Sequence, residues 1–317
     1  MAKYRTALPQ LSDKLFLTDS GLETSLIFHE GIDLPCFASF TLLSDPAGCK
    51  MLTDYYRRHA ALARERRLGF VLESVTWRAN PDWGAKLGLD AKALAKANRE
   101  AIRMLEEVRA EMETPASPMP ISGNIGPRGD GYVVGATMTI HEAERYHGAQ
   151  IRVFADTAAD YVSAFTLTYP QEAIGVVRAA RTNGLPSVIS FTVEIDGRLP
   201  NGMALGEAIM TVDDATDGAA AYFMVNCAHP THFEAVFDSG EAWTRRIGGI
   251  RANASRRSHA ELDNSADLDD GDPAELGLQY RDLLRRLPAI RVVGGCCGTD
   301  FRHVEQIGFA CAALEAA

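Results

Sequence analysis

The sequence predicts a single-domain (β/α)8 barrel, or TIM barrel, that spans residues 1–317. Short apolar runs rich in β-branched residues alternate with segments of helical periodicity along the whole chain, and there are eight such runs, the strand number of this barrel. The length permits one barrel or two ordinary domains, but the last helical segment, 300–317, leaves no second domain behind it. A doubly wound open sheet is the competing architecture.

The eight runs are expected to form parallel strands. They are almost continuously apolar, as strands are when both faces of a parallel sheet are covered. In chain order the runs are 15–20, 69–75, 119–125, 160–166, 186–192, 221–227, 246–252 and 290–296.

Helices are expected between these runs, most clearly at 91–112, 170–184 and 273–288. The first of these segments places apolar residues at helical spacing, which predicts an amphipathic helix packed on the sheet. The region 251–275 is the least regular, with seven acidic and no basic residues in its last fifteen. It is predicted to be a long solvated loop between the seventh strand and the seventh helix. It does not match the pattern of a calcium-binding loop.

Composition limits the choice of partners. The chain has 46% hydrophobic and 23% charged residues, which is typical of globular proteins, and a formal net charge of −10. This charge argues against a nucleic-acid partner, whose phosphates would be repelled. No stretch is long and apolar enough for a membrane span, and the first residues lack the apolar core of a signal peptide. We therefore expect a cytoplasmic protein without a membrane partner, while a homo-oligomer remains open.

Three cysteines stand where predicted strands end. Cys227 closes the sixth run, and Cys296 and Cys297 follow the eighth. Working residues of such barrels lie at the carboxyl ends of the strands, and strands six and eight flank strand seven, so the three sulfurs can converge. Three thiolates suit Zn²⁺ and leave a fourth position open, as in catalytic zinc sites. The fold assignment therefore makes a zinc site at this rim one interpretation of the three cysteines.

Two other interpretations of these cysteines remain open at this point. They can be small buried apolar residues, or Cys296 and Cys297 can form a vicinal disulfide that acts as a redox switch. Adjacent cysteines on a regular strand would point to opposite faces. The neighbouring Gly294, Gly295 and Gly298 would let the backbone turn both sulfurs toward one ion.

Five segments, taken in order, resemble the homocysteine S-methyltransferase family: "LTDSGLETSL" (17–26), "ESVTWRAN" (73–80), "SGNIGP" (122–127), "VNCAHP" (225–230) and "GGCCGT" (294–299). The resemblance implies a zinc-dependent barrel with Cys227, Cys296 and Cys297 as ligands and no catalytic residue beyond the zinc site. It implies transfer of a methyl group from a small sulfonium or ammonium donor, of the S-methylmethionine, S-adenosylmethionine or betaine class, to a zinc-bound thiolate. The default acceptor is homocysteine, which would become methionine.

The resemblance also implies substrate contacts. Asp19 and Gly21 belong to the strand-one motif that contacts the amino-acid part of homocysteine. Ser74 and Thr76 fall in the strand-two motif that helps to hold the substrate. Asn226 precedes the first ligand and is expected to orient it.

Two positions depart from the family pattern. Glu23 stands where a small residue is usual and adds a carboxylate near the rim. Phe165 stands at the end of the fourth strand, where the family usually has the Glu that binds the substrate amino group. Phe165 motivates an alternative, a methyltransferase for a different thiol or selenol. A further alternative is a non-catalytic barrel that senses metal or redox state through the same cysteines.

Overall fold

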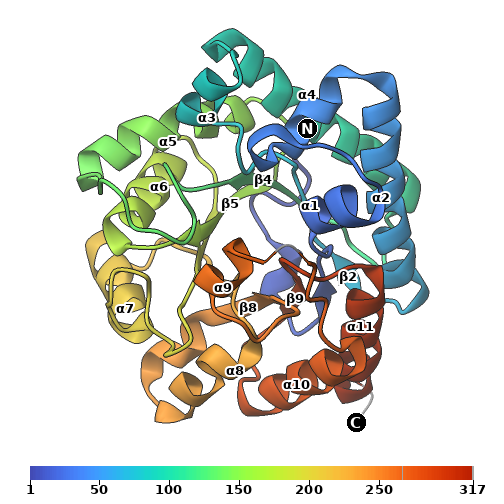
Figure 1. Ribbon diagram of the computed structural model, residues 1–317, viewed down its shortest axis with the longest axis vertical. Coiled ribbons are helices and arrows are strands. Elements are labelled where there is room, and N and C mark those ends of the chain that lie inside the picture. Colours follow the sequence, from blue (N-terminus) through green and yellow to red (C-terminus); the bar gives the residue numbers. More distant parts are fainter. Residues whose placement is uncertain (266, 316–317) are drawn as a thin grey trace.

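The computed structural model describes residues 1–265 and 267–315, and these form a barrel of parallel strands surrounded by helices (Figure 1). The strands are β1 (Phe16–Leu17), β2 (Gly69–Phe70), β3 (Leu72–Glu73), β4 (Ile121–Ile125), β5 (Tyr161–Leu167), β6 (Ser187–Phe191), β7 (Tyr222–Asn226), β8 (Ile247–Ala252) and β9 (Val292–Gly295).

The sheet closes on itself with eight strand positions. Its order is β2-β1-β9-β8-β7-β6-β5-β4-β3, and β2 and β3 are the two halves of one segment interrupted at Val71. β1 pairs with β2 and with β9, and β3 pairs with β4, all in parallel. Each strand lies within one of the runs expected from the sequence, except that β5 extends one residue beyond its run, to Leu167. The predicted barrel is confirmed, and the open sheet is wrong.

The helices are α1 (Leu22–Thr24), α2 (Pro46–Glu65), α3 (Pro81–Lys86), α4 (Ala91–Met112), α5 (Ile140–Ala155), α6 (Pro170–Thr182), α7 (Leu205–Thr216), α8 (Pro230–Phe233), α9 (His259–Asp263), α10 (Pro273–Arg286) and α11 (Phe301–Glu315). The helices expected at 91–112, 170–184 and 273–288 correspond to α4, α6 and α10. Side chains cap the first turns of α4 and α10: Asp90 accepts a hydrogen bond from the Ala93 amide, and Asp272 accepts from the Ala274 amide. No helix within the described residues is long and apolar enough to cross a membrane.

Two apolar cores result from this arrangement. The larger one lies between the sheet and the surrounding helices. The smaller one fills the inside of the barrel with side chains from the strands, among them Phe16, Val71, Tyr161, Met224 and Val292. This inner layer makes the barrel a packed core rather than a channel, so substrates can enter only at an end.

The region 251–275 differs from the solvated loop that was predicted. It contains α9, whose start is fixed by a reciprocal capping box between Ser258 and Glu261. His259 is buried, and Asp269 accepts a hydrogen bond from Ser255 Oγ at 2.7 Å. Several acidic residues, among them Glu261, Asp269 and Asp272, thus cap helices or accept hydrogen bonds, whereas Asp263 and Asp267 are exposed. The segment lines the pocket at the end of the barrel.

Candidate functional site

The three predicted cysteines meet at the carboxyl end of the barrel. Cys227 follows β7, and Cys296 and Cys297 follow β9; their sulfurs all lie within 4.8 Å of one another. Cys227 and Cys296 are joined as a disulfide, whereas Cys297 is a free thiol with its Sγ 3.7 Å from Cys227 Sγ. The alternative of a vicinal Cys296–Cys297 disulfide is therefore wrong, because the bonded pair spans two strands. The predicted convergence of the three sulfurs is confirmed.

Local backbone geometry produces this convergence. Cys227 has a φ of 54°, a left-handed conformation that costs energy for a residue with a Cβ. Its amide donates to the Arg251 carbonyl at 3.0 Å, which ties the turn to β8. Gly298 has a φ of 78°, and a Cβ on Gly294 would overlap Thr18 Oγ1. The glycines therefore have different tasks: Gly298 provides the turn, and Gly294 allows close packing on the strand-one segment.

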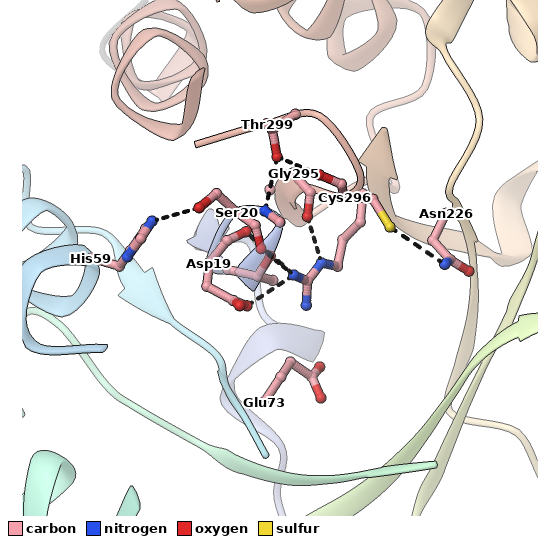
Figure 2. A network of polar contacts seen from close by, with 12 residues as sticks. Asp19, Ser20, His59, Glu73, Asn226, Gly295, Cys296 and Thr299 are labelled. Atoms are coloured by element: carbon pink, nitrogen blue, oxygen red, sulfur yellow. Dashed lines mark hydrogen bonds and ion pairs between the residues drawn. The ribbon is translucent and has the colours of Figure 1, made fainter. Parts of the chain in front are cut away.

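Polar and aromatic side chains surround the sulfurs. Asn226 Nδ2 lies 3.9 Å from Cys296 Sγ and donates to Thr166 Oγ1 at 2.9 Å (Figure 2). The Tyr132 hydroxyl lies 3.4 Å from the sulfurs of both Cys227 and Cys297. The Tyr132 ring stands 4.2 Å from that of His259 on α9, so the segment after β4 and the segment after β8 meet above the cluster.

Below the cluster, a pocket of about 520 Å³ opens into the barrel. Four ionisable wall residues, three acidic and one basic, come from the segment after β1, from α1, from β3 and from β8: Asp19, Glu23, Glu73 and Arg251. The Phe165 ring, Ser74 and Asn226 also line it. The pocket thus offers sulfur at its rim, ionisable oxygen and nitrogen on its floor, and an aromatic wall.

Arg251 forms the centre of this floor. It is 7% exposed, and its Nη2 lies 2.9 Å from Asp19 Oδ1. Its Nε donates to the Gly295 carbonyl at 3.0 Å, and Figure 2 shows Asp19, Ser20 and Gly295 around these contacts, with Glu73 on the side away from Thr299. Burial alone would lower the pKa of Arg251, but the carboxylates of Asp19 and Glu73 raise it above its ordinary value. The guanidinium therefore stays charged.

Two further carboxyl groups face the pocket, and each accepts a hydrogen bond from a serine hydroxyl. Glu73 is buried at the end of β3, and its Oε2 accepts from Ser163 Oγ at 2.6 Å. Glu23 Oε1 accepts from Ser39 Oγ at 2.7 Å. Burial raises the pKa of both carboxyls above the ordinary value. Each has a hydroxyl donor but no direct ion pair within the described part of the chain.

Phe165 lies where β5 bends. Its ring is buried among the inner-core residues and stands 5.3 Å from the Arg251 guanidinium carbon. The next residue, Thr166, has a φ of 63°, and its amide donates to Asn226 Oδ1 at 2.9 Å. Asn226 thus fixes both the end of β5 and the neighbourhood of Cys296, which extends the orienting role expected for it.

The other expected contact residues have mainly structural surroundings. Thr76 is fully buried, does not line the pocket, and donates to the Asn124 carbonyl at 2.7 Å. Ser74 does line the pocket and lies 2.6 Å from Thr76 Oγ1. A Cβ on Gly21 would collide with the Cys296 carbonyl, so Gly21 lets the segment after β1 pack against the cysteine loop.

Sequence reasoning missed four residues of this site: Glu73, Tyr132, Arg251 and His259. Two of them carried a signal, because a Glu or Arg inside an apolar strand run is rarely buried without a partner. Tyr132 and His259 carried none, since they come from loops whose path only the folded chain reveals.

The fold and the site define a TIM-barrel protein with three convergent cysteine sulfurs, in an arrangement that could hold a metal ion, above a charged pocket. The comparisons with known proteins make this specific. The family model for homocysteine S-methyltransferase matches residues 16–311. The chain therefore belongs to the homocysteine S-methyltransferase family, and it is an enzyme of the methyltransferase class.

Solved structures share the fold. The homocysteine methyltransferase MmuM from Escherichia coli, in an oxidised form, superposes with a TM-score of 0.73 at 18% identity over 99% of both chains. Its metallated form gives a TM-score of 0.71 at 18% identity over 98% of this chain and 99% of that one. No curated protein sequence matches the chain.

Proposed function

We propose that this protein is a zinc-dependent thiol S-methyltransferase, with residues 1–317 acting as one domain and homocysteine as the default acceptor. The observation that carries the proposal is the placement of three sulfurs within 4.8 Å of one another at the mouth of a pocket with a charged floor. Family membership supports the reaction class. A cytoplasmic location is part of the proposal, because that compartment keeps such thiols reduced.

The cysteine cluster fits Zn²⁺ by its chemistry and spacing. Zinc is tetrahedral with Zn–S bonds of ~2.3 Å, which puts its sulfur ligands about 3.8 Å apart. Cys297 Sγ and Cys227 Sγ are 3.7 Å apart. Reduction of the Cys227–Cys296 bond would free the other two ligands, so that all three sulfurs could bind the ion. When bound, the ion would lower the pKa of an acceptor thiol and so supply a thiolate at neutral pH.

The chain's own residues would position the reactants. Asn226 and Gly294 hold the cysteine loop in place, and the pocket below it receives the carbon chain of the acceptor. The acceptor sulfur supplies the electron pair for the new S–CH₃ bond. The bond from the methyl carbon to the cationic sulfur or nitrogen of the donor breaks at the same time, and its electron pair stays with the departing neutral thioether or amine. The acidic groups of the pocket favour a cationic donor.

A second candidate is a barrel that senses redox state or metal without catalysing transfer. The Cys227–Cys296 disulfide motivates it, because this bond uses two of the three ligands. Oxidation would then release the ion. E. coli MmuM has been solved in both an oxidised and a metallated form.

One experiment separates the two candidates. Reduced, zinc-loaded protein is incubated with each donor (S-methylmethionine, S-adenosylmethionine and betaine) and with thiol acceptors, and the products are identified by mass spectrometry. Methylated thiol from at least one pair supports the transferase. Zinc binding without methyl transfer from any donor–acceptor pair would favour the second candidate, the barrel that senses redox state or metal.

A further inference from the structure

Asp19, expected to contact the amino-acid part of the substrate, and Phe165, at the position tied to its amino group, already face a cation of the protein itself. Asp19 pairs with Arg251 at 2.9 Å, and the Phe165 ring stands 5.3 Å from the Arg251 guanidinium carbon. Carboxylate pairing and contact with an aromatic face are the two ways in which this part of the pocket can stabilise a positive charge. Arg251 uses both. An incoming ammonium would have to compete with a buried guanidinium or lie beside it.

The same guanidinium retains one unused nitrogen. Its Nε donates to the Gly295 carbonyl, and its Nη2 is taken by Asp19 and by the Ser20 carbonyl at 3.2 Å. For Nη1, no partner is present within the part of the chain that the structure describes. The side chain is more than nine-tenths buried and lines the pocket. Such a nitrogen, on a buried guanidinium, favours an anionic oxygen ligand.

The guanidinium is also close to the sulfur cluster. Arg251 Nε bonds the carbonyl of Gly295, which directly precedes Cys296, and the Arg251 carbonyl accepts from the Cys227 amide. An acceptor with its sulfur at the cluster and its carbon chain in the pocket would bring its other end to the floor that Arg251 forms.

We propose that Arg251 binds the carboxylate of the acceptor and that the acceptor needs no α-amino group: the enzyme's preferred acceptor class is a short-chain thiol carboxylate. The inference rests on the proposed function, whose acceptor it narrows. Burial raises the pKa of Glu23 and Glu73, so these two carboxyls add less repulsion than their number suggests. Homocysteine remains a substrate through its own carboxylate.

The first test compares three acceptors that differ at one end, with one methyl donor and reduced, zinc-loaded protein. These are homocysteine, 4-sulfanylbutanoate, which lacks the amino group, and 3-aminopropane-1-thiol, which lacks the carboxylate. We expect kcat/KM for 4-sulfanylbutanoate to equal or exceed that for homocysteine, and kcat/KM for the aminothiol to be about 10- to 100-fold lower, because it forgoes a charge-assisted hydrogen bond.

The second test changes the residue. R251M should lower kcat/KM for both acids by about 10- to 100-fold but should not lower it for the aminothiol, because an ammonium no longer competes with the guanidinium; R251K should recover part of the loss for the acids. R178M, at an exposed arginine on α6, is the matched control and should change nothing. Zinc content and thermal stability of each variant show whether it is folded and loaded.

Product binding gives a readout that needs no turnover. Calorimetric titration with 4-(methylsulfanyl)butanoate should show binding to the wild type and at least tenfold weaker binding to R251M. Titration with 3-(methylsulfanyl)propylamine should show weak binding to both proteins. Equal binding of the acid to wild type and R251M would overturn the inference whether or not transfer is observed.

The remaining outcomes separate this inference from the proposed function. A strong wild-type preference for homocysteine over 4-sulfanylbutanoate, abolished by E23A, would show that Glu23 binds the ammonium. It would overturn the inference and leave the transferase intact. Absence of transfer from every pair, together with tight binding of the acid product, would instead remove the proposed function and keep the assignment of Arg251.

Discussion

The rim and the floor of the pocket are built in different ways. The rim consists of three cysteines that follow directly after β7 and β9, and a few neighbouring residues set their geometry. The floor consists of side chains from β3, β5, β8 and the segment after β1, which are far apart in the sequence and adjacent only because the barrel closes. Short segments of sequence therefore indicate the reaction class, whereas the acceptor choice that we propose depends on contacts between residues far apart in the sequence.

Removal of a rim sulfur should have the largest effect. C227S, C296S or C297S each leaves two sulfurs, and we expect zinc content to fall from about one ion per chain to a small fraction and transfer to be lost. C49S, at a half-buried cysteine outside the cluster, is the control. Metal analysis and the transfer assay on the same preparations provide the measurement. Full zinc content in all three variants would refute the ligand assignment.

The second-largest effect is expected when the contact between rim and floor is removed. Asn226 contacts Thr166, Ser190 Oγ at 2.6 Å and Cys296 Sγ, so N226A should weaken zinc binding by about 10- to 100-fold. The measurement is competition with a chelator of known affinity. N201A, in an exposed turn, should retain wild-type affinity. Unchanged affinity in N226A would mean that the rim is held without help from the floor.

A change confined to the floor should alter selectivity and leave the rim intact. F165E places a carboxylate beside Arg251 and Asp19, where it can accept a hydrogen bond from an ammonium group. We expect the ratio of kcat/KM for homocysteine to that for 4-sulfanylbutanoate to rise about tenfold, with normal zinc content. F165L removes the ring without adding charge and should not raise the ratio. The same rise in F165L would show that ring size, rather than charge, sets the preference.

The smallest effect concerns stability and pH. Burial raises the pKa of Glu73 above its ordinary value of 4.5, so the folded state binds this proton more tightly than the unfolded state does. The resulting stabilisation is complete below the ordinary pKa and is lost as pH rises through the raised one. E73Q cannot ionise, so its melting temperature relative to wild type should increase over this pH range.

The melting-temperature difference between E73Q and wild type should therefore be larger at neutral pH than below pH 4.5. E65Q, at an exposed glutamate near the end of α2, should show no such trend. A melting-temperature difference between E73Q and wild type that does not change with pH would mean that Glu73 titrates normally.

The sequence predicted the barrel and the rim because both depend on local patterns. Buried parallel strands need near-continuous apolar runs, and metal ligands need cysteines at strand ends, so both are visible in short segments. Short sequence patterns could not predict the disulfide partner of Cys296. Cys227 comes close to Cys296 only because β7 and β9 lie on either side of β8 in the folded barrel.

The floor was predicted only in part. Asp19, Glu23 and Phe165 were recognised as candidates, but the cation that pairs with Asp19 was missed. Arg251 lies in an ordinary strand run, and its partners are 44 residues away at Gly295 and more than 200 residues away in the segment after β1. The order in the acidic region 251–275 was missed for the same reason. The contacts that order it involve neighbours that only the folded chain brings close.

The central claim, that this chain transfers methyl groups to a thiol at a three-cysteine zinc site, is tested most directly by one labelling measurement. Reduced protein of known zinc content is given a donor with a deuterated methyl group and a thiol acid, and the same assay is run after chelation and after zinc is restored. We predict a labelled thioether only from protein with about one zinc per chain, lost on chelation and regained with zinc. Equal labelling by the metal-free protein, or none from any donor at full zinc content, would contradict the account.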